Sequence, residues 1–468
     1  MVRMGALLLI ILYECKCLMC GMKAAKLVLV GDRENRYSVN ALVAAAIELG
    51  LVNEVDLVTT TYAAAPSILN SLRGEKVIVG ASLLTTQLVR KLDRVLELVR
   101  AAKRVEALTI VGGPHASGDP YGSIISLGFD LAVVGDGEVV LPEVVREYIG
   151  GGDPCSVEGV ACLEGGRVRL RGRGFVKELD PWPSFPLRLI KMFGPIEVGR
   201  GCPHACRYCA VSFTFSARMR HRGVESVVEH VERMRSFGLR DIRFITPNAL
   251  AYGSLDGRTR NLDAVQNLLE ALQPYRARGM RVFLGSFPSE VRPEHLDEEA
   301  AHIMRRYVDN KRIIVGAQTG SNDLLKRIGR GHTAEDALAA VEAAVSAGFR
   351  AEVDYIFGLP GETEEDIDAT IEHMREAINL GGRVHAHAFM PLPGTPYSFA
   401  PPGKVPEKVR RFLIKYAGRG AVYGQWEEQE KLAEGIARLR DEGIIIISPA
   451  ARTHYLGISD GAISAISR

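Results

Sequence analysis

Two runs of alternating strand and helix patterns make up most of this chain, and a proline-rich segment at 180–186 separates them. The strand segments are short, rich in β-branched residues and almost continuously apolar, which is typical of parallel strands buried on both faces. Three prolines within 180–186 exclude a helix or a central strand there. A chain of 468 residues is also too long for one ordinary core. We therefore predict two α/β domains in series.

The first run predicts a doubly wound, Rossmann-like sheet, a fold that binds ligands beyond the carboxyl ends of its strands. Its expected strands are 26–32, 55–60, 76–82, 107–114 and 130–135. Its expected helices are 39–49, 66–72, 87–103 and 141–148. The turns after each strand are therefore the informative segments of this domain.

The second run predicts a partial (βα)6 barrel, whose chemistry should gather at the carboxyl ends of the strands. Its expected strands are 195–198, 241–246, 281–287, 312–318, 350–358 and 384–390. Its expected helices are 224–237, 262–272, 294–306, 334–347 and 364–379.

The predicted domain boundaries are a leader at 1–21, a Rossmann-like domain at 22–150, a hairpin and proline-rich linker at 151–190, the partial barrel at 191–400 and a small α/β extension at 401–468. In the extension we expect helices at 406–416 and 426–440 and a short strand at 444–447. The leader holds an apolar run too short to cross a bilayer, followed by Cys15, Cys17 and Cys20. Two interpretations remain for it: a second metal or redox cluster, or an untranslated leader with the true start at Met22. We favour the second.

The composition is that of a soluble globular protein, with 47% hydrophobic and 24% charged residues. A net charge of +2 argues against nucleic acid or membrane partners. The arginines of 167–173 alternate along an expected hairpin, where a charged strand edge is the favoured interpretation over an RNA or phosphate contact. Eight cysteines in a chain of this length do not form a secreted disulfide framework, so we expect a reducing, cytoplasmic location.

Three cysteines follow the first strand of the second run in the spacing CxxxCxxC: Cys202, Cys206 and Cys209. A structural zinc site needs four ligands, and no second pair follows at zinc-finger spacing. Three thiolates on one loop suit a cubane iron–sulfur cluster in which one iron has no protein ligand. The alternatives are half of a zinc site and three chance cysteines.

With Pro203 and Tyr208, this loop resembles the cluster motif of the radical SAM superfamily. The resemblance implies a [4Fe–4S] cluster held by the three cysteines and S-adenosylmethionine (SAM) bound to the open iron. Tyr208 would then lie near the adenine. By the same resemblance, further strand-end residues would contact SAM: Pro247, Asn248, Ser286, Glu290, Gln318 and Gly358.

Two histidines, His385 and His387, fall on one face of the last predicted barrel strand, because side chains alternate along a strand. If that face lines the barrel, they could contact substrate or move a proton near neutral pH. The alternative is that this face points outward.

The turns of the first domain resemble those of the cobalamin (B12)-binding domain of methionine synthase and its relatives. Ser82-Leu83-Leu84 matches the family pattern SxL, and Gly112-Gly113 follows after 27 intervening residues. The family's cobalt-ligating histidine is replaced by Tyr37, so cobalt would have no histidine ligand, or the fold persists without the cofactor. The residues that the resemblance places at cobalamin are Tyr37, Ser82, Leu84, Gly112, Gly113, His115, Gly135, Gly137 and Glu138. For His115, a local turn hydrogen bond is an equal alternative.

Together, the two resemblances imply a cobalamin-dependent radical SAM enzyme that methylates an unactivated carbon. Such an enzyme cleaves SAM to a 5′-deoxyadenosyl radical with an electron from a donor such as ferredoxin or flavodoxin. The alternatives are radical cyclisation or rearrangement, a methylthiotransferase, and a cobalamin or redox sensor without catalysis. The substrate is not identified by the sequence.

Overall fold

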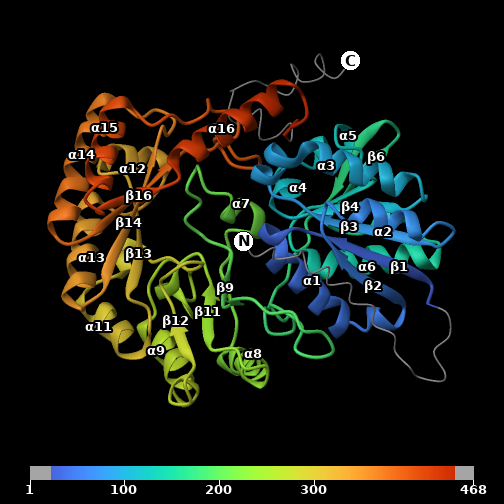
Figure 1. The fold of residues 1–468 in the computed structure, drawn as a ribbon, viewed down its shortest axis with the longest axis horizontal. Coiled ribbons are helices and arrows are strands. Elements are labelled where there is room, and N and C mark those ends of the chain that lie inside the picture. Colours follow the sequence, from blue (N-terminus) through green and yellow to red (C-terminus); the bar gives the residue numbers. More distant parts are fainter. Residues whose placement is uncertain (1–22, 448–468) are drawn as a thin grey trace, which may run out of the picture. The chain divides into compact units, whose positions relative to one another are not determined.

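The computed structural model describes residues 23–447, which form two compact units. Unit 1 contains 23–176, 182–192 and 439–447, and unit 2 contains 177–181 and 193–438. Most of unit 1 is drawn in blue to teal and most of unit 2 in green to red (Figure 1). The exceptions are the short segments 177–181, 182–192 and 439–447, which follow the colour of their place in the sequence. The predicted leader, with Cys15, Cys17 and Cys20, lies outside the described residues.

Unit 1 is a seven-stranded sheet in the order β2-β1-β3-β4-β5-β6-β7, and its first five strands are parallel. The prediction of a doubly wound sheet is therefore confirmed. The strands are β1 (Ala25–Val30), β2 (Val55–Thr60), β3 (Val77–Ser82), β4 (Leu108–Gly112), β5 (Leu131–Val133), β6 (Val160–Glu164) and β7 (Arg167–Arg171). The main helices are α1 (Arg36–Glu48), α2 (Ala65–Ser71), α3 (Thr85–Lys103) and α6 (Gly137–Gly150).

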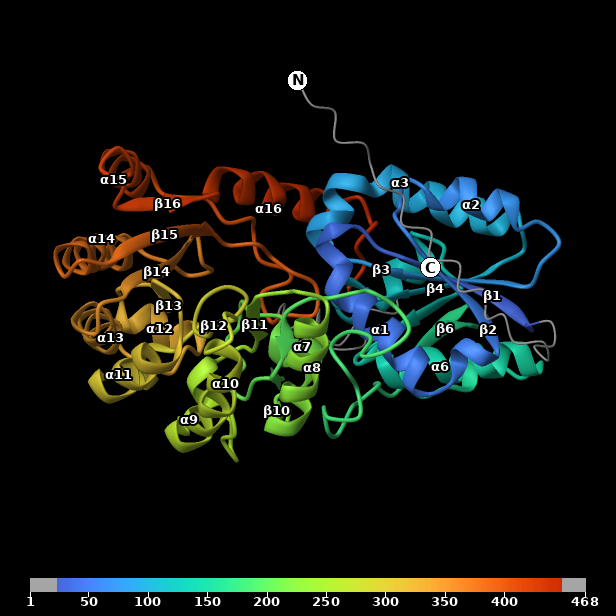
Figure 2. The same ribbon diagram turned by 60° about the horizontal axis from the view of Figure 1, so that its bottom comes forward.

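Helices cover both faces of this sheet, with α1 and α6 on one face and α2 and α3 on the other (Figure 2). Aliphatic side chains of the strands and of α1 and α6 form the core; Leu27, Val43, Val144 and Val160 are fully buried in it. Two short helices that the sequence patterns did not predict follow β4, namely α4 (Pro114–Gly118) and α5 (Pro120–Ile125).

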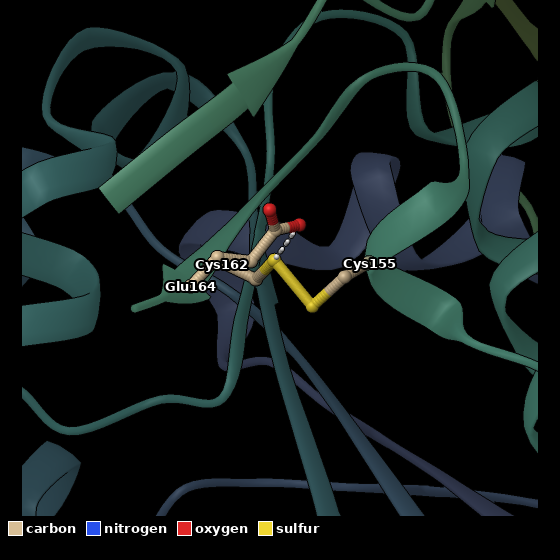
Figure 3. A group of neighbouring side chains, drawn as sticks. All are labelled: Cys155, Cys162 and Glu164. Carbon is tan, nitrogen blue, oxygen red and sulfur yellow. Dashed lines mark hydrogen bonds between the residues drawn. A yellow bond between two sulfur atoms is a disulfide. The ribbon is translucent and has the colours of Figure 1, made fainter. Parts of the chain in front are cut away.

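The hairpin that the sequence placed in the linker belongs to the sheet. Strand β6 pairs antiparallel with β5, and β7 pairs with β6 at the sheet edge, where its arginines are exposed. Within this hairpin region Cys155 and Cys162 form a disulfide (Figure 3). The Glu164 Oε1 atom lies 3.6 Å from the Cys162 Sγ atom. This is one local cross-link, not a disulfide framework.

Unit 2 is a curved, parallel βα array, as predicted for the partial barrel. Strands β12, β11 and β8 form one parallel group, and β13, β14, β15 and β16 form another. A bridge between Val291 and Val315 links the two groups. The strands are β8 (Ile196–Glu197), β11 (Asp241–Ile245), β12 (Arg281–Phe283), β13 (Arg312–Gln318), β14 (Arg350–Phe357), β15 (Arg383–Ala388) and β16 (Val422–Gly424).

Helices follow the strands of unit 2 as the periodicity predicted. The long helices are α8 (Val224–Ser236), α9 (Leu262–Ala271), α11 (Glu298–Tyr307), α13 (Ala334–Ser346), α14 (Glu364–Asn379), α15 (Glu407–Ala417) and α16 (Trp426–Asp441). Short elements missed by the patterns are the hairpin β9 (Gly199–Arg200) and β10 (Arg220–His221), and the helices α7 (Val211–Phe215), α10 (Gln273–Arg276) and α12 (Asn322–Ile328). No helix in 23–447 is both long and apolar enough to cross a membrane.

Two predicted strands differ in the structure. The prediction of a strand at 444–447 is wrong: this segment is irregular and belongs to unit 1. The backbone N–H groups of Ile446 and Ile447 donate to the buried Asp119 carboxylate, which replaces a strand partner. The third barrel strand ends at Phe283 rather than at 287, because the chain turns at Gly285 with a φ of 72°.

Candidate functional site

The three-cysteine loop lies between β9 and α7 and is held by its own backbone. Gly201 has a φ of 86°, and a Cβ there would lie 2.2 Å from the carbonyl oxygen of Arg218. The Cys202 N–H donates to Ser216 O at 3.1 Å, and the Cys209 N–H donates to Cys206 O at 3.0 Å. The loop is therefore folded tightly enough to bring three thiols, separated by only a few residues, to one place.

A cavity of about 590 Å³ opens in front of this loop within unit 2. Its wall is built from residues at the carboxyl ends of several strands, as expected for a parallel barrel. The residues predicted from the sequence that line it are Cys202, Cys206, Cys209, Tyr208, Pro247, Glu290, Gln318 and His387. The structure thus brings together residues that are up to 185 positions apart, Cys202 and His387.

None of the three thiols forms a disulfide, and burial affects their protonation. Cys206 is 4% exposed, and burial raises the pKa of the Cys209 thiol to about 12. Such a thiol stays protonated at neutral pH unless it meets positive charge, and a bound metal supplies that charge by deprotonating the thiols that coordinate it. Three free thiols on one loop, with Cys206 buried and Cys202 and Cys209 partly exposed, therefore fit a metal cluster better than a reactive surface thiol.

A buried arginine that the sequence patterns missed lies beside the thiols. The Nη1 atom of Arg330 is 3.9 Å from the Cys206 Sγ atom, and its Nη2 donates to Gly316 O at 2.8 Å. Arg330 is 8% exposed, and its carbonyl accepts a hydrogen bond from the equally buried Arg292. Arg330 follows α12 in a glycine-flanked loop with no periodic pattern, so only its burial distinguishes it from a surface arginine.

Three residues predicted to contact SAM lie away from the cavity wall. The side chain of Asn248 is buried, with Nδ2 2.9 Å from His295 Nδ1. The Ser286 Oγ atom is buried and does not line the cavity. Gly358 has a φ of 73°, and a Cβ there would meet Lys404 N at 2.4 Å. Their roles as SAM contacts stay predictions.

Two other predicted residues present carboxyl and amide groups to the cavity. Glu290 is exposed on the cavity wall, and partial desolvation by the surrounding protein raises its pKa to about 7, with the negative charge of Asp354 adding to this increase. Gln318 ends β13 at a register shift with a φ of 72°, which turns its amide out of the strand path. Both groups can hydrogen-bond a polar ligand in the cavity.

In unit 1, the residues predicted to contact cobalamin occupy the carboxyl edge of the sheet. Ser82 ends β3, Gly112 ends β4, and Gly113 has a φ of 92°. A Cβ at Gly113 would lie 3.0 Å from the carbonyl oxygen of Leu83. The others are Leu84 before α3, His115 in α4, Gly135 after β5, Gly137 and Glu138 at the start of α6, and the half-buried Tyr37 in α1.

His115 is fully buried at this edge and has one side-chain partner. Its Nδ1 lies 3.1 Å from the Thr85 Oγ1 atom, while its Nε2 is buried without a hydrogen-bond partner. Burial lowers the pKa of His115 to about 4, so the ring is neutral at pH 7. The nitrogen without a partner fits a contact with a polar ligand group at this edge, whereas Gly113 lets the turn after β4 pack against Leu83.

Residues 196–374 match the model of the radical SAM superfamily. Among curated proteins, an uncharacterized protein of Methanopyrus kandleri is 25% identical over 371 residues, covering 68% of this chain and 69% of that protein. An uncharacterized methyltransferase of Pyrococcus horikoshii is 26% identical, covering 60% of each chain. The threonylcarbamoyladenosine tRNA methylthiotransferase MtaB of Thermotoga maritima is 30% identical, covering 46% of this chain and 48% of that protein.

Two solved structures have a similar fold. The radical SAM methyltransferase TsrM from Kitasatospora setae, with cobalamin and a [4Fe–4S] cluster bound, has a TM-score of 0.64 and 18% identity, covering 80% of this chain and 74% of that chain. The cobalamin-dependent SAM radical enzyme OxsB has a TM-score of 0.61 and 14% identity, covering 95% of this chain and 71% of that chain. At these identities the likeness concerns the fold.

A radical SAM domain implies a [4Fe–4S] cluster and SAM, and the free thiols of unit 2 lie on the wall of a cavity open to a ligand. Residues 196–374 therefore form a radical SAM domain, and the chain shares its fold with solved cobalamin-binding radical SAM proteins.

Proposed function

We propose that this protein is a cobalamin-dependent radical SAM methyltransferase that acts on an unactivated carbon. The observation that carries the proposal is the set of three free thiols on the wall of the 590 Å³ cavity, in a chain whose other unit offers a glycine-lined ligand edge. The name of the Pyrococcus relative and the fold of TsrM support methyl transfer.

Cys202, Cys206 and Cys209 would hold the cluster, and Tyr208 would cover one side of the cofactor from the same loop. The buried Arg330 would neutralise negative charge at Cys206. Glu290 and Gln318 would hydrogen-bond polar groups of SAM or substrate. The cluster supplies a single electron, received from a donor such as ferredoxin or flavodoxin, to cleave SAM.

Cobalamin, when bound, would supply a methyl group to the substrate. It would lie at the carboxyl edge of the unit 1 sheet, where Gly113 and Gly135 allow tight turns that a Cβ at either position would block. Neutral His115 has a free Nε2 for a polar group of the ligand. Tyr37, at the position of the family's cobalt-ligating histidine, offers no imidazole.

The enzymatic part is tested with anaerobically reconstituted protein, SAM and a strong reductant. We expect about four irons per chain and formation of 5′-deoxyadenosine and methionine, measured by liquid chromatography and mass spectrometry. Cys206→Ala should abolish both iron binding and SAM cleavage. The matched control is Cys155→Ala, which removes a cysteine distant in sequence from the loop and should keep both. SAM cleavage by Cys206→Ala, or none by the wild type, would overturn the proposal.

Cobalamin dependence is tested separately by its visible spectrum. Adding hydroxocobalamin to the wild-type protein should shift its absorption bands and leave one cobalamin per chain after gel filtration. A protein that cleaves SAM but shows no shift and retains no cobalamin would be a radical SAM enzyme without this cofactor, and the methyl-transfer proposal would fail.

A methylthiotransferase is not the function we propose, although MtaB is a relative. Within residues 23–447, two cysteines lie outside the loop, and they form a disulfide with each other. The described part of the chain therefore offers no second set of three cysteines for an additional cluster.

A further inference from the structure

A second group of metal-ligand side chains converges on the wall of the cavity in unit 2. It consists of Asp354 on β14 and of His385 and His387 on β15, and we name it the Asp–His–His cluster. The Asp354 Oδ1 atom lies 2.8 Å from His385 Nδ1 and 3.8 Å from His387 Nε2. The two imidazole nitrogens are 3.1 Å apart. The proposed SAM chemistry does not use these groups.

These separations match the spacing of donor atoms around one metal ion. Zinc lies about 2.0–2.2 Å from imidazole nitrogen and carboxylate oxygen, so tetrahedral donors are about 3.4 Å apart. The three observed separations, 2.8, 3.1 and 3.8 Å, fall on both sides of that value. One ion could therefore contact all three atoms with only small shifts.

Hydrogen bonding alone leaves the cluster unsatisfied. Gln429 accepts a hydrogen bond from the Ala388 N–H through Oε1, so its Nε2 faces His387 Nδ1, 3.1 Å away. A neutral His387 then carries its proton on Nε2, facing His385 Nδ1. His385 Nδ1 cannot both accept that proton and donate one to Asp354. A cation bound by all three groups removes this conflict.

The backbone and neighbouring rings hold the cluster in place. Asp354 and His385 are directly paired in the parallel register of β14 and β15, so their side chains share one face of the sheet. The ring of Tyr423 on β16 stacks on His385, with centroids 4.2 Å apart and an interplanar angle of 4°. The Tyr423 hydroxyl in turn donates to Glu352 at 2.8 Å. Ligands on two adjacent strands lose little freedom when they bind an ion.

We propose that Asp354, His385 and His387 bind a divalent transition metal ion of the zinc type, with an open coordination position toward the cavity. Two imidazoles and one carboxylate suit zinc and its first-row neighbours rather than magnesium or calcium, which prefer oxygen. Three protein ligands leave a fourth position free, and both Asp354 and His387 line the cavity. A substrate hydroxyl, carbonyl or carboxylate oxygen fits that position.

The test uses the reconstituted full-length protein, freed of loose metal on a chelating resin and then equilibrated with Zn²⁺. We expect one zinc per chain in addition to the cluster iron, measured by inductively coupled plasma mass spectrometry. Zinc X-ray absorption should show nitrogen and oxygen neighbours at about 2.0–2.1 Å and no sulfur at about 2.3 Å. Magnesium in large excess should not displace the zinc.

Variants separate this site from the three-cysteine loop. His387→Ala and Asp354→Asn should lose the zinc while keeping the iron, and His302→Ala, an exposed histidine on α11, should keep both. Gln429→Glu is the variant expected to strengthen zinc binding rather than abolish it. One of its carboxylate oxygens can accept from Ala388 N–H and the other from His387 Nδ1–H, which frees Nε2 for the metal. We expect zinc to bind about 10–100-fold more tightly.

Any of three results would overturn the proposal: equal zinc binding by the wild type and His387→Ala, zinc with sulfur neighbours in its absorption spectrum, or a wild type that retains no zinc. None of these measurements depends on SAM cleavage or on cobalamin. The zinc proposal can therefore be wrong while the proposed function holds, and the proposed function can be wrong while the zinc proposal holds.

Discussion

The two units place polar residues at the same location, the carboxyl edge of a parallel sheet, but use them differently. In unit 1 those residues bond to other parts of the same unit: the Tyr62 hydroxyl donates to the backbone carbonyl of Ser82 at 2.8 Å, and the Lys91 ammonium donates to the Asp32 carboxylate. In unit 2 the corresponding residues line a cavity of about 590 Å³. The comparison teaches that the barrel edge leaves its polar groups facing a cavity, whereas the sheet edge bonds several of its polar groups within the protein. The following predictions test that difference.

The largest effect is expected at Arg330 in unit 2. Arg330→Met leaves Cys206 and Gly316 O without their buried partner, and removes the positive charge beside the thiols. We expect SAM cleavage to fall at least about tenfold and the cluster potential to become more negative, because fixed charge near a cluster tunes its potential. Iron content and 5′-deoxyadenosine formation measure this. Arg281→Met, with an exposed guanidinium, should behave as the wild type; equal loss in both would contradict the role of Arg330.

The next largest effect is the loss of stability of unit 1 at acid pH. Burial lowers the pKa of His115 from 6.5 to about 4, so between these values the unfolded state binds more protons than the folded state. Stability therefore falls as the pH falls from 6.5 to 4, by up to about 3 kcal/mol. Hydrogen exchange of β4 should report this loss.

His115→Gln should remove that acid sensitivity, because an amide does not titrate and can still bond Thr85. An unchanged pH dependence of β4 exchange in this variant would show that another group is responsible. Exchange in β14 of unit 2 is the internal reference.

A third prediction separates the two groups of cysteines. Reducing the Cys155–Cys162 disulfide opens a loop with a sequence separation of seven residues, which should lower the stability of the hairpin by about 2–3 kcal/mol on chain-entropy grounds. Iron binding by the loop in unit 2 should not change. Hydrogen exchange of β6 and iron analysis of the Cys155→Ala protein measure the two effects; loss of iron would contradict their independence.

The smallest effect is expected at the glycines of unit 1. Gly113 and Gly151 both have a positive φ, but Gly113 has a ψ of −176°, a region almost exclusive to glycine, so an alanine is more strained there than in the left-handed helical conformation of Gly151. A Cβ at Gly113 also meets Leu83 O at 3.0 Å, whereas nothing lies within 4 Å of one at Gly151. Gly113→Ala should therefore weaken cobalamin binding about tenfold and Gly151→Ala should not, as titration of the visible spectrum would show. Equal affinities would place cobalamin elsewhere.

The sequence predicted the long elements well, because their signals are local. Continuous apolar runs gave the strands of both sheets, and the period of the helix gave α8, α13 and α14 within one or two residues. Short elements such as α12 and β16 were missed, since three to seven residues hold too little pattern. The apolar run at 444–447 was misread as a strand because apolarity does not reveal that Asp119 accepts its N–H groups.

By itself, the sequence determined the two α/β units, the three-cysteine loop and the order in which strand ends present their residues. These follow from hydrophobic periodicity and from ligand spacing, both of which are local. Only the tertiary structure decided which distant side chains meet: Arg330 beside Cys206, Asp354 beside His385, and Asn248 bonded to His295 instead of facing the cavity. Burial, strand register and the direction of each side chain arise from packing between elements, and no local pattern records them.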